Sequence, residues 1–350
     1  MSKAGPTTVR GTGLAAFTTL RVGGPAAAMV HAETETDLVA VVRELDAAGE
    51  RVLVLGGGSN LVVSADGFAG TVVQVATRGI TAVESACAGA EVTVAAGEGW
   101  DEFVALTVER DWSGLEALSG IPGLVGATPI QNVGAYGADV SQTVARVRTF
   151  DRSTGTITTV AAADCGFGYR DSMFKRNPDR YLVCSVTFQL PLGSLSAPIR
   201  YAEVARRLGV ELGERVPTTL LRDTVLALRR GKGMVLDDAD HDTWSVGSFF
   251  TNPIMSAAAA KRLPADAPRY PADGDLVKTS AAWLIEHAGY SRGYGAGPAQ
   301  VSGKHTLALT NRGSATTEDV LELAREIRAG VETAFGVTLV AEPTMINCEL

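Results

Sequence analysis

Cysteine and histidine are scarce in this sequence, and neither is arranged for metal binding. Among 350 residues there are four cysteines and four histidines. The cysteines, Cys87, Cys165, Cys184 and Cys348, form no CxxC pair, and the histidines form no HExxH motif. We therefore expect no metal site and no disulfide framework, but four reduced thiols in a cytoplasmic protein.

Long apolar runs and an excess of positive charge are also missing. The longest apolar stretches, such as residues 52–55, fall far short of the roughly 18 residues that span a bilayer. Residues 1–13 lack the apolar core of a secretory signal. The 31 basic and 39 acidic residues leave a net charge of −8, which disfavours broad binding to a phosphate backbone. We expect neither a membrane nor a nucleic-acid partner, and the length suggests two or three domains.

Glycine is abundant and unevenly placed. The 39 glycines cluster in residues 56–58, 120–137 and 293–303. Clustered glycine indicates positive φ angles or a close approach of the backbone to another group. These segments are where we look first for function.

The remaining pattern contains both strands and helices along the chain. A helix is predicted around residues 38–45, with Thr34 and Asp37 as its capping box. A second is predicted to begin at Thr316 and to end at Gly336. Strict alternation over residues 182–190 predicts a half-buried strand. Further strands are expected at 52–55, 61–63, 71–75 and 92–95, helices at 100–108 and 220–230, a hairpin at 146–160, and loops over 256–275.

The segment Gly56-Gly57-Gly58-Ser59-Asn60 offers adjacent backbone N–H groups without side chains, as a pyrophosphate requires. It is not a dinucleotide fingerprint, because it lies between strands and lacks the GxGxxG spacing. A tight turn between two strands explains the segment equally well.

The segment from Gly120 to Gly137 is rich in glycine, carries amide side chains and has almost no charge. Small uncharged residues allow a flat heteroaromatic ring to lie against the backbone, whereas a linker is more often charged and solvated. We favour a cofactor-binding role for this segment.

Three shorter motifs permit two interpretations each. Arg170 in Gly168–Ser172 could clamp a carboxylate, or could form a surface ion pair with Asp171. Residues 229–232 could meet a diphosphate, or could place cations at a helix C-terminus. Residues 247–253 place Ser248 between a glycine and two aromatic residues. The two interpretations are a nucleophilic serine, which the absence of the GxSxG spacing disfavours, and an ordinary turn into a buried aromatic strand.

Taken in order, these motifs resemble the family of UDP-N-acetylenolpyruvoylglucosamine reductases, in the longer type that carries a substrate-side tyrosine, here Tyr201. The resemblance covers about residues 15 to 346 and rests on the segments 55–61, 120–137, 168–172 and 247–253, and on Glu342. The sequence departs from the family pattern at two places: Thr18-Thr19-Leu20 replaces the more usual Asn-Thr-Phe, and Thr344 occupies a position where arginine is common. Glu349 lies close to Glu342 in the sequence and competes with it for the same role.

The resemblance implies three domains. Two form an FAD-binding unit of the vanillyl-alcohol-oxidase type, at 11–75 and 76–232, and the tail 343–350 is a candidate to return to the first of them. The third, at 233–342, is an α+β domain for a UDP-sugar. It further implies non-covalent FAD, NADPH as co-substrate and no required oligomer.

The resemblance also assigns residues to roles. Arg170, Ser248 and Glu342 match the catalytic positions. The residues that match the FAD contacts are Gly56, Gly57, Gly58, Ser59, Asn60, Leu61, Pro122, Gly123, Gly126, Ala127, Thr128, Gln131, Asn132, Gly134 and Gly137. The residues that match the substrate contacts are Tyr169, Tyr201, Arg229, Lys232, Asn252 and Tyr270.

The implied reaction belongs to peptidoglycan synthesis and has two halves. NADPH reduces FAD, and hydride then passes to the enolpyruvyl group of the UDP-sugar while Ser248 supplies a proton. Two rival hypotheses remain: an FAD oxidase of the same fold, and a non-catalytic protein with a degenerate flavin site.

Overall fold

The computed structural model describes residues 7–350. The expectation that residues 1–13 carry no secretory signal therefore lies outside the described residues for positions 1–6. The chain divides into two compact units, which we describe separately. Of the described residues, unit 1 comprises 7–12, 26–57 and 69–230, and unit 2 comprises 13–25, 58–68 and 231–350.

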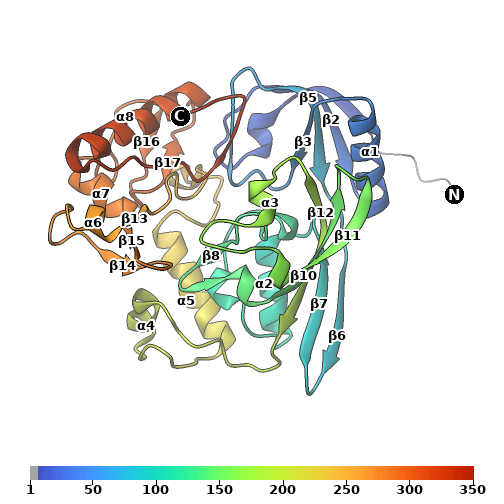
Figure 1. Ribbon diagram of the computed structural model, residues 1–350, viewed down its shortest axis with the longest axis horizontal. Helices are drawn as coiled ribbons and strands as arrows, with labels where there is room; N and C mark the ends of the chain where they lie inside the picture. The colour runs from blue at the N-terminus through green and yellow to red at the C-terminus, as the bar shows by residue number, and fades with distance from the viewer. Residues whose placement is uncertain (1–6) are drawn as a thin grey trace. The chain divides into compact units, whose positions relative to one another are not determined.

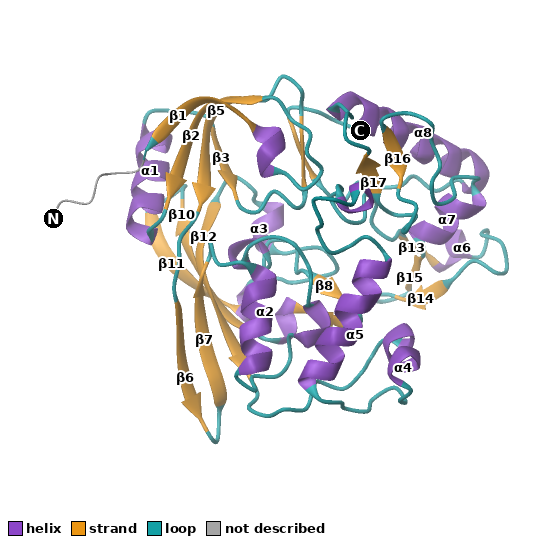
Figure 2. Cartoon of the chain, turned by 180° about the vertical axis from the view of Figure 1, so that it is seen from behind, coloured by secondary structure: helices purple, strands orange, loops and turns teal. Residues whose placement is uncertain are grey.

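The first sheet of unit 1 contains four strands in the order β1-β2-β5-β3. Their bounds are Thr8–Gly13, Pro25–Ala32, Phe68–Val75 and Val52–Leu55. Helix α1 (Glu35–Ala47) lies along this sheet (Figures 1 and 2) and begins at Thr34, whose side chain accepts a hydrogen bond from the Asp37 N–H. The predicted helix and its cap are confirmed.

The second sheet of unit 1 is antiparallel and contains five strands in the order β11-β10-β12-β7-β6. Their bounds are Thr156–Ala161, Val144–Asp151, Tyr181–Leu190, Gly89–Ala95 and Ile80–Ser85. The prediction that residues 182–190 form a strand is confirmed by β12, but the prediction that this strand is half-buried is wrong. β12 is the central strand of the sheet and is buried on both faces over most of its length. The expected hairpin at 146–160 is confirmed as β10 and β11.

Helix α2 (Trp100–Glu109) covers one face of this second sheet. Phe103 of α2 and Phe188 of β12 have ring centroids 5.1 Å apart, and Trp100 lies 6.0 Å from Phe188. All three rings are almost fully buried, so they form the aromatic centre of the core.

The last part of unit 1 carries short elements and one longer helix. They are β8 (Gly134–Ala135), β9 (Ala138–Asp139), α3 (Met173–Arg176), α4 (Ala202–Leu208) and α5 (Thr218–Gly231). Val204 of α4 and Leu221 and Val225 of α5 form a small separate core with Ile199 and Val216.

Unit 2 contains three small sheets and three helices. The sheets are β4 (Leu61–Val63) with β18 (Thr344–Ile346), β13 (Ile254–Ser256) with β15 (Leu276–Thr279) and β14 (Arg269–Pro271), and β16 (Ala299–Val301) with β17 (Leu309–Asn311). The helices are α6 (Ala257–Ala260), α7 (Ala281–His287) and α8 (Thr317–Phe335). Thr316 and Asp319 form the predicted capping box of α8, and Gly336 ends it with a φ of 64°.

The C-terminal tail runs along the early segment of unit 2, because β18 pairs in parallel with β4. The exact three-domain boundaries stay a prediction. Over residues 7–350, no helix is both long and apolar enough to cross a membrane, and no group of three or more His, Cys, Asp or Glu side chains is arranged to hold a metal ion.

Candidate active site

Two glycine-rich loops of unit 1 meet backbone to backbone. A Cβ atom added at Gly57 would lie 2.7 Å from the Cα atom of Gly123. A Cβ atom added at Gly126 would lie 2.4 Å from the Cβ atom of Ala96. Glycine is therefore required at these positions by the packing of the protein itself.

The loop after β3 presents free backbone donors. The N–H groups of Gly57, Gly58 and Ser59 make no hydrogen bond to any residue between 7 and 350. Consecutive N–H groups of this kind, with no bulky side chain over Gly57 and Gly58, form a concavity that binds phosphate oxygens. The residues present thus fit the pyrophosphate of FAD.

The segment 120–137 ends in a hairpin that presents a tyrosine. Strands β8 and β9 are joined by Tyr136 and Gly137, whose φ angles are 52° and 81°. Positive φ at both central residues defines a type I′ turn, which normally favours Asn-Gly. A bulky residue at the first of these positions is strained, so Tyr136 is held there by its surroundings. Burial raises its pKa to about 12.

The motif 168–172 docks onto this same segment. The Arg170 guanidinium donates to the Gly134 carbonyl at 2.9 Å, and the Ser172 hydroxyl donates to the Ile130 carbonyl at 2.5 Å. Asp171 pairs with Arg176 and not with Arg170, so the alternative of an Arg170–Asp171 surface pair is wrong. Two predicted motifs therefore form one surface in unit 1, with Arg170 fixed at a φ of 53°.

Arg229 belongs to the last turn of α5 and is close to Arg170. Burial, together with the positive charge of Arg170, lowers the pKa of Arg229, and Tyr136 and Asp101 offset part of this effect. Two neighbouring guanidinium groups, one of them desolvated, make a site that favours an anion. Arg229 and Arg170 together therefore provide the positive charge that binds a carboxylate or phosphate group. Arg229 also lies at a helix C-terminus, as the alternative interpretation predicted.

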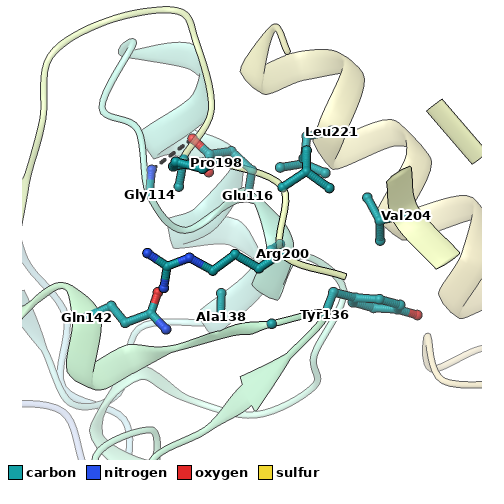
Figure 3. A pocket seen from close by; sticks show the side chains of 13 residues that line it. Gly114, Glu116, Tyr136, Ala138, Gln142, Pro198, Arg200, Val204 and Leu221 are labelled. Carbon is teal, nitrogen blue, oxygen red and sulfur yellow. Dashed lines mark hydrogen bonds between the residues drawn. The ribbon is translucent and has the colours of Figure 1, made fainter. Parts of the chain in front are cut away.

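Tyr201 lies against the tip of the hairpin. Its ring meets the Tyr136 ring edge to face, with centroids 5.5 Å apart. A small cavity next to this pair is lined by Glu116, Arg200 and Val204 as well as Tyr136 (Figure 3). Its volume of about 30 Å³ admits a water molecule or two, so it is a packing gap and not a substrate site.

Ser248 and Glu342 come together in unit 2. The Glu342 N–H donates to the Phe249 carbonyl at 2.9 Å, and Thr251 N–H donates to the Val340 carbonyl at 3.0 Å. The residues that follow Ser248 therefore run antiparallel to the segment that ends in Glu342. The Ser248 hydroxyl makes no hydrogen bond to any described residue, which leaves it available to a ligand.

The competing carboxylate, Glu349, is placed differently. Glu349 is exposed, and its carbonyl accepts from Arg325 of α8 at 2.9 Å. Glu342 is only 9% exposed. Burial beside Ser248 favours Glu342 for the catalytic role.

Several predicted contact residues also have a role within the protein. The Asn132 side chain donates to the Gly168 carbonyl and accepts from the Ser141 N–H, and the Thr128 hydroxyl donates to the Val125 carbonyl. The Asn252 side chain accepts from Ala281 at the start of α7. Tyr169 and Tyr270 are exposed, at 41% and 52%. Lys232 is half-buried, directly after α5.

Comparison with known proteins shows the family to which the chain belongs. Residues 238–346 match the family described as UDP-N-acetylenolpyruvoylglucosamine reductase, C-terminal domain, and residues 26–161 match the FAD binding domain family. A UDP-N-acetylenolpyruvoylglucosamine reductase of Cutibacterium acnes is 57% identical over 340 residues, which cover 96% of this chain and 90% of that protein. The chain belongs to the UDP-N-acetylenolpyruvoylglucosamine reductase family.

Other members of the reductase family agree. The enzyme of Thermobifida fusca is 57% identical over 348 residues, covering 96% of this chain and 97% of that protein. A crystal structure of the Thermus caldophilus reductase superposes with a TM-score of 0.65 at 24% identity and covers 97% of this chain and 98% of that one, which shows a shared fold. The expected family, the α+β FAD-binding fold with a C-terminal domain, and the flavoprotein oxidoreductase class are confirmed.

Proposed function

We propose that this protein reduces the enolpyruvyl group of UDP-N-acetylglucosamine-enolpyruvate to give UDP-N-acetylmuramate, with NADPH as the source of hydride. The observation that carries the proposal is the hydrogen bond from the Glu342 N–H to the Phe249 carbonyl, because it brings Ser248 and Glu342 together. The family's reaction needs a proton donor beside a carboxyl group, and this pair supplies both.

The loops described above would hold FAD. The N–H groups of Gly57, Gly58 and Ser59 would bind its pyrophosphate, and the uncharged segment 120–137 would accommodate its ring system. When bound, FAD supplies hydride transfer, which no side chain can perform. Direct contacts of Gly126 and Asn132 with FAD, and of Asn252 with the substrate, remain predictions, and each of these residues has the structural role described above.

Arg170 acts on the charge that develops in the substrate. Hydride addition to the terminal vinyl carbon leaves an electron pair on the α-carbon, which the neighbouring carboxylate delocalises. The Arg170 guanidinium, held by its bond to Gly134, can meet that carboxylate with two N–H groups. Because the charge grows along the reaction, this contact strengthens in the transition state.

Ser248 and Glu342 complete the addition. The α-carbon takes a proton from the Ser248 hydroxyl, which has no competing partner among residues 7–350. Serine is a weak acid, so this transfer requires the strongly basic carbon that precedes it. Glu342, whose backbone is paired with that of Phe249, would hold or share a proton in this step. Location in the cytoplasm and the absence of a nucleic-acid partner stay predictions from the sequence.

Anaerobic stopped-flow absorbance tests the proposal. Loss of the flavin band with NADPH and its return on addition of UDP-N-acetylglucosamine-enolpyruvate is the expected result. A reduced protein that only oxygen reoxidises would support the oxidase alternative. A colourless protein that FAD cannot reconstitute would overturn the flavoenzyme assignment.

The variant Ser248→Ala tests the proton donor. Reduction by NADPH should stay at the wild-type rate, because the serine has no part in it. The second half-reaction should slow by about 10²–10⁴-fold, the usual worth of a positioned acid. Equal slowing of both halves would argue against this role.

A further inference from the structure

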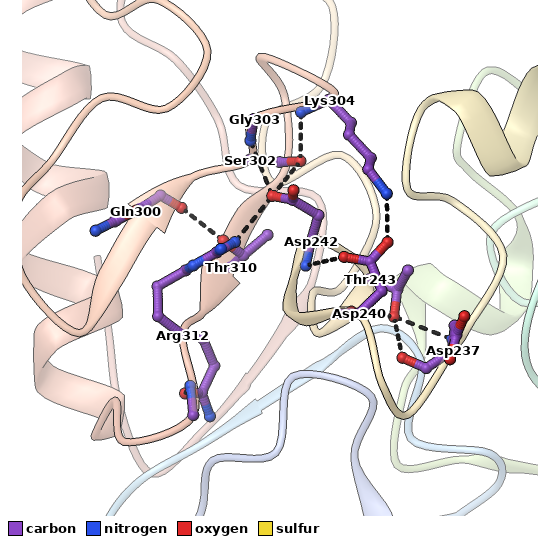
Figure 4. A network of polar contacts seen from close by, with 12 residues as sticks. Asp237, Asp240, Asp242, Thr243, Gln300, Ser302, Gly303, Lys304, Thr310 and Arg312 are labelled. Carbon is purple, nitrogen blue, oxygen red and sulfur yellow. Dashed lines mark hydrogen bonds and ion pairs between the residues drawn. The ribbon is translucent and has the colours of Figure 1, made fainter.

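The loop that precedes Ser248 is clamped by one carboxylate, that of Asp242. Its Oδ1 atom accepts three hydrogen bonds (Figure 4): from the Ser302 hydroxyl at 3.0 Å, from the Gly303 N–H at 2.9 Å and from the Arg312 guanidinium at 2.9 Å. The Asp242 side chain is only 15% exposed. Hydrogen bonds to a charged acceptor in partial burial are the stronger kind.

The clamp reaches a residue predicted to bind substrate. A Cβ atom added at Gly233 would lie 2.8 Å from the Asp242 carbonyl oxygen, so the chain after Lys232 packs directly on Asp242. Lys304 of the same turn pairs with Asp240. The contacts of Asp240 and Asp242 therefore connect the 237–247 loop with the chain after Lys232, with the 302–304 turn and with Arg312.

The loop stays fixed between Asp242 and Ser248. Trp244 lies under the Arg21 guanidinium at 3.9 Å, and its carbonyl accepts from the Asn311 N–H at 3.0 Å. The Ser245 carbonyl accepts from the Thr19 hydroxyl at 2.6 Å. The peptide chain up to Ser248 is thus restrained by contacts that begin at Asp242.

Ser248 itself has no such restraint. Its hydroxyl makes no hydrogen bond to any described residue, so no neighbouring side chain orients it. The position of the hydroxyl is set by the backbone on either side: by Phe249, whose N–H donates to the Leu307 carbonyl at 2.7 Å, and by the loop that Asp242 holds.

We infer that Asp242 is a positioning residue for the proton donor Ser248. This inference rests on the proposed function. Its action is through the loop: without the carboxylate charge, the shared acceptor of the three donors is neutral and holds them more weakly, the loop relaxes, and the hydroxyl moves away from the α-carbon. A misplacement of about 1 Å is enough to cost on the order of 10²-fold in rate.

The test compares Asp242→Asn with Asp238→Asn. Asp238 is on the same loop, and its 84% exposed side chain pairs with Arg21, so Asp238→Asn removes the same charge and one surface ion pair while the three hydrogen bonds to Asp242 stay in place. With Asp242→Asn, reduction by NADPH should be unchanged and reoxidation by the UDP-sugar about 10–100-fold slower. Asp238→Asn should match the wild type in both halves.

The stereochemistry of the product gives a second readout. Protonation makes the α-carbon a stereocentre, and a misplaced Ser248 lets water protonate the other face. Asp242→Asn should therefore yield a measurable fraction of the opposite lactyl epimer, detected by chromatography of the product. A purely structural loss of active protein would lower both rates and leave the epimer ratio unchanged, and that result would overturn the inference.

Amide hydrogen exchange separates this inference from the proposed function. Exchange in residues 243–249 should be faster in Asp242→Asn than in wild type or Asp238→Asn, whatever the substrate is. Unchanged exchange would overturn the inference, whereas a wild type that the UDP-sugar cannot reoxidise would overturn the function. If Asp242→Asn does not fold, Ser302→Ala removes one of the three donors and should show the same changes at smaller size. Wild-type rates and exchange in that variant would count against the clamp.

Discussion

Gly57→Ala examines whether the two glycine-rich loops are held together as the structure shows. The new Cβ atom would lie 2.7 Å from the Cα atom and 3.3 Å from the carbonyl carbon of Gly123. Non-bonded carbon atoms prefer about 3.5–4.0 Å, so the loops must separate by about 1 Å. Both contacts are to backbone atoms, and no rotamer change can relieve them.

The expected magnitude follows from that overlap. Overpacking of this kind costs about 1–3 kcal/mol. If the cost falls on the state that binds FAD, the dissociation constant rises by about 5- to 150-fold. Any part of the cost that is already present without FAD lowers the stability of the apoprotein instead, so thermal unfolding of the apoprotein measures that part.

Gly56→Ala is the matched control. A Cβ atom there would meet Leu124 at 3.8 Å and Ala127 at 4.0 Å, which are ordinary contacts. Its apoprotein should unfold within about 0.5 kcal/mol of wild type. Fluorescence titration of the apoprotein with FAD and thermal unfolding without FAD provide the two measurements. If Gly57→Ala binds FAD and unfolds as wild type does, the reasoning about loop contact is refuted.

Two further predictions concern single carboxylates. Glu342→Gln should slow reoxidation by the UDP-sugar at least 10-fold while Glu349→Gln stays near wild type in stopped-flow assays, and the reverse order would reassign the role. The hydrogen bonds from Arg180 and Ser153 hold the pKa of Asp151 far below its usual range, so the stabilisation it provides is complete above about pH 5 and is lost progressively as the pH falls further. Asp151→Asn should therefore cost about 1–2 kcal/mol at pH 7 and progressively less at lower pH, and a difference in denaturation midpoint that does not shrink with acid would contradict this assignment.

Much of the fold could be predicted because its signals are local. The cap of α8 at Thr316 and its end at Gly336 depend only on neighbouring residues, and both are confirmed. The burial of β12 could not be predicted in the same way. Alternating side chains predict one solvated face, but whether a face meets water is decided by the elements that pack on it from elsewhere in the chain, as Phe103 of α2 packs on Phe188.

The candidate site divides along the same line. Clustered glycines pointed to the loop at 56–60 and to the segment 120–137, because glycine marks close backbone approach in the sequence itself. Nothing local marks Asp101, which accepts two hydrogen bonds from Arg222 and one from the Gly120 N–H and so anchors the start of that segment. Burial alone would raise the pKa of Asp101, but these donors outweigh it and lower it. Such pairings join distant parts of the chain, and sequence reasoning has no access to them.

Asn60 shows how one motif can carry two functions. The preceding residues 57–59 keep their N–H groups free, as a phosphate site requires. Asn60 itself binds the other end of the chain within unit 2: its side chain donates to the Glu342 carbonyl at 3.4 Å, and its carbonyl accepts from the Thr344 N–H at 2.9 Å. Leu61 then pairs with Thr344 in the β4–β18 ladder. The asparagine at the end of the glycine run is therefore explained by the position of Glu342, so the loop that would hold the cofactor also fixes the backbone of the proposed catalytic carboxylate.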